Sequence, residues 1–377
     1  MPEADDHLAL ALIPGLGPKL TAALLERFGT AAAARSATAA QLRNIPHIGE
    51  KLADSFAQAL RTVDVKAERE LLAKHGVRPV PLGDPAYPPS LAAVNCPPPL
   101  LYFRGEWTAA DAGAVAIVGS RSCTSYGRKM AEAIARGLVR AGITVVSGLA
   151  RGIDGAAHKA TLDAGGRTIA VLAGGLSAIY PPEHADLAEA VAKQGALVSE
   201  TPMTVAPQPG MFPARNRVIS GLTRATVVIE ANAKSGALIT ARHAGEQGRE
   251  VFAVPGNADS AASAGCLELI RNGARLIRGI DDLLEDLKGI AQPSFEAPKK
   301  PVPTLFEPSP PPPQVNDPPP NLDPAHRAVW DLLVEKRHAD ELTRSTGLSV
   351  SDLSRTLTQL EIKRLVRRLP GNFYERR

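Results

Sequence analysis

The sequence has few cysteines and few aromatic residues, and each shortage excludes a class of protein. Its 377 residues include only three cysteines, Cys96, Cys123 and Cys266, which lie far apart and form no Cys-x-x-Cys pair. A zinc site or a disulfide framework is therefore not expected, and a reducing cytoplasm is the expected compartment. Aromatic residues make up 4% of the chain, so stacking surfaces for nucleobases must be sparse and individually placed.

The chain also lacks the features of an exported or membrane-bound protein. Residues 1–15 carry acidic side chains where a signal peptide needs basic ones, and no apolar run approaches the ~20 residues of a membrane-spanning helix. The net charge is +4 and the isoelectric point is near 9.0. This mild basic excess permits a polyanionic partner without requiring one. We therefore expect a cytoplasmic protein with no membrane partner.

Four regions of different texture follow one another along the chain. Residues 1–75 have helical periodicity broken by Gly/Pro turns and predict a small all-helical domain. Residues 76–290 predict an α/β domain, whose Pro-rich lead-in up to residue 104 is expected to add a strand. Residues 291–324 are dominated by proline and predict a semi-rigid linker. Residues 325–377 predict a winged-helix domain.

Short runs of β-branched residues alternate with helical stretches in the second region. Continuous apolar strands separated by helices predict a Rossmann-like parallel sheet with helices on both faces. In open sheets of this kind, ligands bind beyond the carboxyl ends of the strands. The predicted strands are residues 114–118, 144–146, 168–172, 196–198, 226–229 and 250–254.

The first two of these strands end in turns that suit a phosphate group. Glycine lets the backbone approach an anion, serine and backbone amides donate hydrogen bonds, and arginine adds a bidentate fork. The first turn lacks the Gly-x-Gly-x-x-Gly fingerprint and no acidic residue closes the second strand, which argues against a nicotinamide or flavin cofactor. The predicted phosphate-binding residues of the two turns are Gly119, Ser120, Arg121, Ser147, Gly148 and Arg151.

Two later segments, one ahead of a predicted helix and one after the 226–229 strand, add further donors. Several strong donors beside an aromatic residue suit a nucleic-acid backbone with a base stacked on the ring, although a solvated basic turn is the alternative. The four loops together outline one continuous anion-binding rim, which favours a polymer over a mononucleotide. The residues of the two later segments are Phe212, Arg215, Asn216, Arg217, Lys234, Ser235 and Arg242.

Three residues could in principle carry chemistry. Asp154 and His158 lie four residues apart on one predicted helix, but a catalytic triad would also need a nucleophile elbow of the Gly-x-Ser-x-Gly kind, which is missing. Their alternative role is to fix the loop or the helix start. Glu230 could be a general acid or base, but a single carboxylate more often caps a helix. We therefore predict no catalytic residue, no metal ligand and no cofactor.

Several long motifs follow one another in a characteristic order. They are Gly119-Ser-Arg121 with Tyr126-Gly127, Ser147-Gly-Leu-Ala-Arg-Gly-Ile-Asp154 with His158, Phe212-Pro-x-Arg-Asn-Arg217, and Ser235-Gly-x-Leu-Ile-Thr240 closing on Val254-Pro-Gly256. Residues 76–290 thereby resemble the DprA/Smf (DNA-processing protein A) family.

The resemblance implies a homodimeric protein without enzymatic activity. Such a protein binds and protects incoming single-stranded DNA and helps to load RecA recombinase during natural transformation, with single-strand-binding protein as a further partner. The resemblance also implies that Phe212 stacks on a base. The implied DNA pocket comprises Gly119, Ser120, Arg121, Phe212, Arg215 and Arg217, whereas Ser147, Gly148, Lys234 and Arg242 are predicted on physical grounds alone.

The two end regions also resemble known modules. Ile13-Pro-Gly-Leu-Gly-Pro-Lys19 and Ile45-Pro-His-Ile-Gly-Glu-Lys51 form a repeat similar to helix-hairpin-helix elements, within a region that resembles a sterile-alpha-motif-like domain. His47 replaces the expected first glycine of the second copy. DNA contact and packing or protein contact both stay open for this region.

The tail has the order of elements expected of a winged helix. We predict a helix over residues 339–346, a turn at 347–348, a second helix over 351–360, and strands over 365–369 and 373–377. From Leu322 onward the tail holds eleven Lys/Arg and eight Asp/Glu, a net of +3. The second helix could read a major groove, or it could contact protein. Its candidate groove-reading residues are Ser351, Ser354, Arg355, Thr358 and Gln359.

Two other functions compete with single-strand binding. One is a nucleotide-cleaving hydrolase of the LOG (lysine-decarboxylase-like) type, whose Pro-Gly-Gly-x-Gly-Thr-x-x-Glu motif is matched only by Ala173-Gly-Gly175 and a separate Glu230. The other is a transcription regulator that binds duplex DNA through the winged helix.

Overall fold

The computed structural model describes residues 2–289, 323–333, 337–363, 365–369 and 373–376. It divides into two compact units, Met1–Lys299 and Lys300–Arg377. The predicted linker lies outside the described residues up to residue 322. No helix in the described ranges is both long and apolar enough to cross a membrane.

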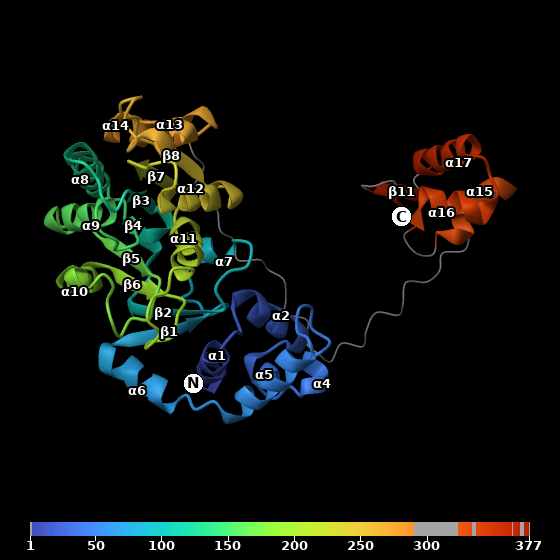
Figure 1. Ribbon diagram of the computed structural model, residues 1–377, viewed down its shortest axis with the longest axis horizontal. Coiled ribbons are helices and arrows are strands. Elements are labelled where there is room, and N and C mark those ends of the chain that lie inside the picture. Colours follow the sequence, from blue (N-terminus) through green and yellow to red (C-terminus); the bar gives the residue numbers. More distant parts are fainter. Residues whose placement is uncertain (1, 290–322, 334–336, 364, 370–372, 377) are drawn as a thin grey trace. The chain divides into compact units, whose positions relative to one another are not determined.

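The first unit is built on one nine-stranded sheet with the order β1-β2-β6-β5-β4-β3-β7-β8-β9 (Figure 1). The strands from β6 to β9 in this order pair in parallel, which confirms the predicted Rossmann-like sheet. The Pro-rich lead-in adds two strands, β1 and β2, and these pair antiparallel at the β6 edge. The strands are β1 (Val77–Pro81), β2 (Leu100–Gly105), β3 (Val115–Gly119), β4 (Val145–Ser147), β5 (Thr168–Leu172), β6 (Ala196–Ser199), β7 (Ala225–Ile229), β8 (Glu250–Ala253) and β9 (Arg275–Leu276).

Helices cover both faces of the sheet because successive side chains of a strand point to opposite sides. In β3, Val115 and Ile117 pack against α8, α9 and α14, whereas Ala116 and Val118 pack against α11, α12 and α13. α10 covers the β5–β6 part of the sheet. The helices are α7 (Pro89–Ala92), α8 (Ser125–Arg140), α9 (Ile153–Asp163), α10 (Ala185–Gln194), α11 (Met211–Gly221), α12 (Gly236–Glu246), α13 (Ala264–Arg271) and α14 (Ile280–Gly289), with short 3-10 helices η1 (Ala109–Gly113) and η2 (Pro182–His184).

The N-terminal region is helical, as predicted, and it packs on the sheet. Leu8 and Leu72 share a core with Val77 and Tyr102, and the Glu68 carboxylate accepts a hydrogen bond from the Met203 amide at 2.8 Å. This region is therefore part of the same compact unit as the sheet. Its helices are α1 (Pro2–Ala11), α2 (Pro18–Phe28), α3 (Ala31–Arg35), α4 (Ala39–Leu42), α5 (Glu50–Thr62) and α6 (Lys66–His75).

The two repeated turns of this region have the same backbone form. Gly15 has φ +82°, and His47, which stands in the place of the glycine in the second copy, has φ +69°. A left-handed conformation is costly for a residue with a Cβ. The second turn therefore keeps the fold of the first, with a side chain added at its bend.

The second unit is a winged helix with the strand order β10-β12-β11. Trp330, Leu342, Leu353 and Leu357 form its core. Both predicted helices and both predicted strands are present, whereas α15 and β10 were not predicted. The residues between the two strands, 370–372, lie outside the described residues. The elements are α15 (Pro324–Leu332), β10 (Arg337–His338), α16 (Ala339–Thr346), α17 (Val350–Ile362), β11 (Val366–Leu369) and β12 (Phe373–Arg376).

Candidate functional site

A cavity of about 640 Å³ opens beyond the carboxyl ends of β3, β4 and β7, where an open parallel sheet places its ligands. We call it the strand-end cavity. Its walls include the loop after β3, the start of α9, the start of α12 and one face of α11. Seven residues predicted from the sequence line it, namely Gly119, Ser120, Arg121, Phe212, Arg215, Asn216 and Ser235.

An aromatic and cationic cluster stands at the mouth of this cavity. The Arg121 guanidinium lies over the Phe212 ring, 4.8 Å from its centroid. The Tyr180 ring packs on Phe212 with centroids 5.8 Å apart, and Tyr180 is 42% exposed. Cation–π contact and tilted ring packing both hold these groups in place while leaving edges in solvent. Tyr180 was missed from the sequence because it lies in an irregular loop, although its rarity as an aromatic residue could have marked it.

Arg215 lines the cavity, but its side chain is buried rather than exposed. It is 5% exposed, and its Nη1 donates to the Val171 carbonyl. Burial lowers the pKa of Arg215 to about 10, with the charge of Asp154 opposing that shift, so the guanidinium stays protonated at neutral pH. Burial raises the pKa of Asp154, and Arg215 opposes that shift in turn. The two side chains therefore stabilise each other as buried opposite charges.

Ser147 and Gly148 use their polar groups inside the protein. The Ser147 hydroxyl donates to the Ile117 carbonyl at 2.6 Å and is fully buried. The Gly148 amide donates to Asp154 at 3.1 Å. A Cβ on Gly148 would lie 2.1 Å from Nη1 of Arg215, so glycine is needed here because arginine packs against it. These are the groups that the sequence prediction offered to a phosphate, and here they hold the loop instead.

The start of α8 is occupied by the chain's own carboxylate. Glu230 is 6% exposed, accepts the Thr124 amide at 2.7 Å and also accepts the Thr124 hydroxyl. A Cβ on Gly127 would lie 2.3 Å from the Glu230 carboxylate, which explains the glycine in the first helical turn. The helix-capping interpretation of Glu230 is confirmed. A carboxylate at a helix N-terminus satisfies the same amides and dipole that would attract a phosphate.

His158 is not placed to act on a ligand. It is fully buried, and its Nδ1 lies 2.7 Å from the Thr168 hydroxyl. Burial lowers the pKa of His158 to about 3. With Ser147 bound to a carbonyl and Asp154 to backbone amides, the three side chains form no catalytic triad. The structural interpretation of Asp154 and His158 is therefore the one that the geometry supports.

Four predicted cations do not line the strand-end cavity. Arg151 is exposed and pairs with Glu183. Lys234 is exposed in the predicted turn, and Arg242 lies on α12 with Glu246 3.9 Å away. Arg217 points away from the strand-end cavity, from another face of α11. The predicted donors therefore do not form one continuous rim. Of the predicted cations, Arg121 is the one that is both exposed and part of the lining of the strand-end cavity.

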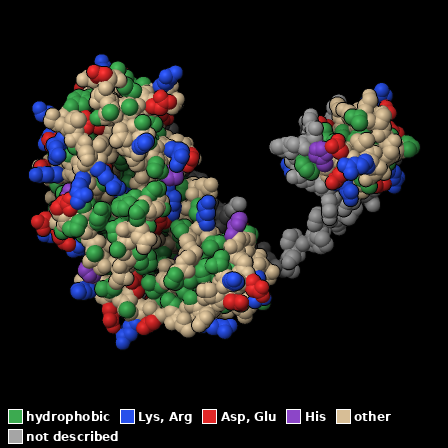
Figure 2. Space-filling model, viewed as in Figure 1, with side chains coloured by type: hydrophobic (Ala, Val, Ile, Leu, Met, Phe, Trp, Pro, Cys, Tyr) green, Lys and Arg blue, Asp and Glu red, His purple; other side chains and the backbone are tan. Residues whose placement is uncertain are grey.

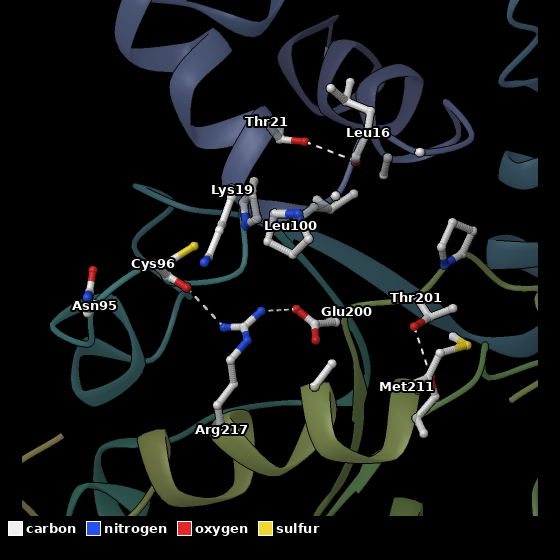
Figure 3. Close-up of a pocket in the computed structure, with 18 of the residues that line it drawn as sticks. Leu16, Lys19, Thr21, Asn95, Cys96, Leu100, Glu200, Thr201, Met211 and Arg217 are labelled. Carbon is white, nitrogen blue, oxygen red and sulfur yellow. Dashed lines mark hydrogen bonds and ion pairs between the residues drawn. The ribbon is translucent and has the colours of Figure 1, made fainter. Parts of the chain in front are cut away.

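Arg217 belongs to a second cavity of about 910 Å³, which we call the α2 cleft (Figure 3). The cleft lies between the first repeated turn with the start of α2 on one side, and β2, the end of β6 and α11 on the other. In it, Arg217 pairs with Glu200 and donates to the Cys96 carbonyl at 3.0 Å. Two neighbouring arginines on α11 therefore serve two different cavities.

The family model described as DNA recombination-mediator protein A matches residues 78–288. The chain belongs to the DprA/Smf family. A model of the DprA winged-helix domain matches residues 309–372, and a SAM-like helix-hairpin-helix tandem matches residues 8–62.

Several bacterial proteins of the DprA/Smf family are similar over much of this chain. Protein Smf of Synechocystis sp. is 36% identical over 389 residues, which cover 98% of each chain. DNA processing protein DprA of Bacillus subtilis is 43% identical over 215 residues, 57% of this chain and 72% of its own.

Two solved DprA structures share the fold. The X-ray structure of DprA from Streptococcus pneumoniae superposes with a TM-score of 0.65 and 33% identity, covering 74% of this chain and 95% of that one. DprA from Helicobacter pylori, whose structure describes a single-stranded DNA binding mode, superposes with a TM-score of 0.51 and 29% identity, covering 56% and 96%.

Proposed function

We propose that this chain binds single-stranded DNA at the strand-end cavity and catalyses no reaction there. The observation that carries the proposal is the exposed Arg121 stacked on Phe212 beside Tyr180, at the carboxyl ends of parallel strands. The single-stranded DNA binding described for the Helicobacter pylori relative supports it.

The chemistry of this cluster fits a single strand. The Arg121 guanidinium offers a fork to a phosphate, and the Phe212 and Tyr180 rings offer faces on which a base can stack. Every base has a π-face, so such contacts tolerate any sequence. Binding is therefore expected to vary little with base sequence and to weaken with salt.

The hydrolase alternative would require Glu230 to face a substrate. Glu230 is held by the amide and hydroxyl of Thr124, so its carboxylate caps α8 and does not face a substrate. The same carboxylate occupies the place where a terminal phosphate of a mononucleotide would meet the helix start. A polymer bound through Arg121 and the two rings is the better fit.

The wider role that we propose follows the family. The chain works in the cytoplasm as a homodimer, protects incoming single strands and helps to load RecA recombinase during natural transformation, with single-strand-binding protein as a further partner. In the winged helix, all five candidate groove-reading residues of α17 are exposed. Because these residues are exposed, they are accessible to either DNA or protein.

The test compares Arg121→Ala with Arg140→Ala in the full-length chain. Arg140 is an exposed arginine at the opposite end of α8, so both variants lose the same charge. Fluorescence anisotropy with labelled single-stranded and duplex oligonucleotides should show a preference for the single strand. Arg121→Ala should weaken single-strand binding by about 1–3 kcal/mol, the scale of a lost charge-assisted contact. Arg140→Ala should bind as the parent does.

Equal affinity of the Arg121→Ala and parent chains would place the DNA elsewhere. A sequence-specific preference for duplex that survives deletion of residues 105–290 would favour the transcription-regulator alternative. The RecA role is tested separately, by whether the chain speeds RecA filament assembly on single strands coated with single-strand-binding protein.

A further inference from the structure

The α2 cleft takes no part in the function proposed above. It is larger than the strand-end cavity, at about 910 Å³ against about 640 Å³. The walls are mostly apolar and include Leu16, Leu100, Met211 and Ala214. Hydrophobic side chains gather on the face drawn in Figure 2 where the N-terminal helices meet the sheet. A cleft of this size and character is suited to a flat, largely apolar group.

Polar side chains, among them His243 and Glu246, stand at several points of the cleft, and charged groups on two of its walls matter most here. At one wall, Arg217 pairs with Glu200 through Oε2 of the carboxylate. At the opposite wall, the exposed Lys19 extends from the start of α2 towards Cys96 and Arg217 (Figure 3). Lys19 forms no ion pair with a described residue. The ion pair offers hydrogen-bond donors and acceptors to the edge of a nucleobase, and Lys19 offers a positive charge to its phosphate.

The cleft and the strand-end cavity lie on two different sides of α11. Phe212, Arg215 and Asn216 of α11 line the strand-end cavity, whereas Met211, Ala214 and Arg217 line the cleft. Ala173, at the end of β5, lines both the cleft and a small pocket that Phe212 and Tyr180 share. An α-helix with its side chains is about 10 Å across. A strand that keeps the stacked spacing of B-form DNA, about 3.4 Å per nucleotide, crosses that width in about three nucleotides.

We propose that the α2 cleft is a second subsite for the same single strand, in which one nucleobase inserts between Leu16 and Ala214 while Lys19 holds a neighbouring phosphate. This inference rests on the proposed function, because it needs a strand already bound at the strand-end cavity. It assigns the N-terminal helices a direct part in gripping DNA.

The native cysteines provide a test. Cys96 lines the cleft, Cys123 follows the Arg121 loop, and both are partly exposed, whereas Cys266 is buried. A Cys123→Ser chain therefore presents Cys96 for disulfide exchange, and a Cys96→Ser chain presents Cys123. Homothymidine oligonucleotides carrying one thiol-tethered base at successive positions are mixed with each variant. The cross-linked species are separated on non-reducing gels.

We expect Cys96 and Cys123 each to cross-link from a defined position, with the two positions about three nucleotides apart. If Cys123 cross-links and Cys96 does not from any position, the cleft holds no DNA and the inference is overturned, while the proposed function stands. Loss of both cross-links together with loss of single-strand affinity overturns the proposed function as well.

A cavity-filling variant gives a second measurement. Ala214 is exposed in the cleft, so Ala214→Trp should block it, and Ala110→Trp in η1, at the opposite end of the sheet, is the matched control. Ala214→Trp should weaken the binding of a long oligonucleotide on the order of tenfold, the loss of one bound base. It should leave an oligonucleotide that is too short to cross α11 bound as before. Equal binding of the long oligonucleotide by both variants would contradict the subsite.

Discussion

The strand-end cavity and the α2 cleft lie on two faces of α11, and they divide their positive charges in the same way. Each has one arginine that is engaged by protein groups: Arg215 with Val171 and Asp154, and Arg217 with Glu200 and Cys96. Each also has one exposed cation, Arg121 in the cavity and Lys19 in the cleft. The comparison teaches that the position of a cation in the sequence motif does not show whether it is free to bind a ligand or is engaged by other groups of the protein.

The largest expected effect separates these two roles. Arg215→Ala leaves Asp154 buried without its opposite charge, so the free energy of unfolding should fall by about 3–5 kcal/mol. Arg217→Ala removes a less buried pair and should cost about 1–3 kcal/mol. Urea denaturation followed by circular dichroism measures both. Arg121→Ala, the surface counterpart, should change stability by less than about 0.5 kcal/mol.

An Arg215→Ala chain as stable as the parent would contradict the structural role given to Arg215. In that case, Arg215 would belong with Arg121 among the cations that are available to DNA. A loss of single-strand affinity without any loss of stability would make the same point.

A second prediction concerns pH and the buried groups behind the strand-end cavity. The pKa of His158 falls to about 3 in the folded chain, from an ordinary value of 6.5. Between these values the unfolded chain binds more protons than the folded one, so this contribution to stability is complete above pH 6.5 and is lost as the pH falls. Its slope reaches about 1.4 kcal/mol per pH unit.

The measurement is urea denaturation between pH 7.5 and pH 5 of the parent and of His158→Gln. The difference in unfolding free energy between the two chains should shrink towards low pH, because glutamine does not titrate. Parallel pH profiles of the two chains would show that His158 is accessible to protons in the folded state.

The smallest expected effect tests the exposed cation of the cleft. Lys19→Ala should reduce single-strand affinity by less than about 1 kcal/mol, as for a surface charge in solvent. It should also lower the salt dependence of binding by about one released counterion. Lys51, the exposed lysine at the same position of the second repeat, is the matched control. Equal salt slopes for the parent and Lys19→Ala would remove Lys19 from the DNA path.

The sequence predicted the sheet and the location of the strand-end cavity, because apolar periodicity and the rule of carboxyl-end binding do not depend on side-chain direction. It did not predict which donors are free. Arg215 and Arg217 were expected in a turn ahead of a helix, where both could face one ligand. They lie inside α11, and two residues along a helix differ by about 200° in direction. The first therefore points to one cavity and the second to the other.

The glycines and serines misled in a related way. A Gly–Ser turn at a strand end indicates backbone amides close to an anion, and the structure places anions there. They are the chain's own carboxylates, Asp154 at Gly148 and Glu230 at the start of α8. Local sequence patterns do not identify the anion, because Asp154 and Glu230 reach these amides only through the tertiary fold. Tyr180 was missed for the same reason, since its contact with Phe212 joins a loop to a helix that is distant in the sequence.

The carboxylate at the start of α8 also bears on how quickly DNA can bind. The Glu230 side chain holds Thr124, and the backbone carbonyl of Glu230 accepts a hydrogen bond from the Ser120 amide at 2.7 Å. The loop that carries Arg121 is thus fixed at both ends without any ligand. Association then requires no ordering of that loop and loses little conformational entropy. The rate at which a strand is captured should be set by electrostatic encounter, so added salt should slow it and base sequence should not.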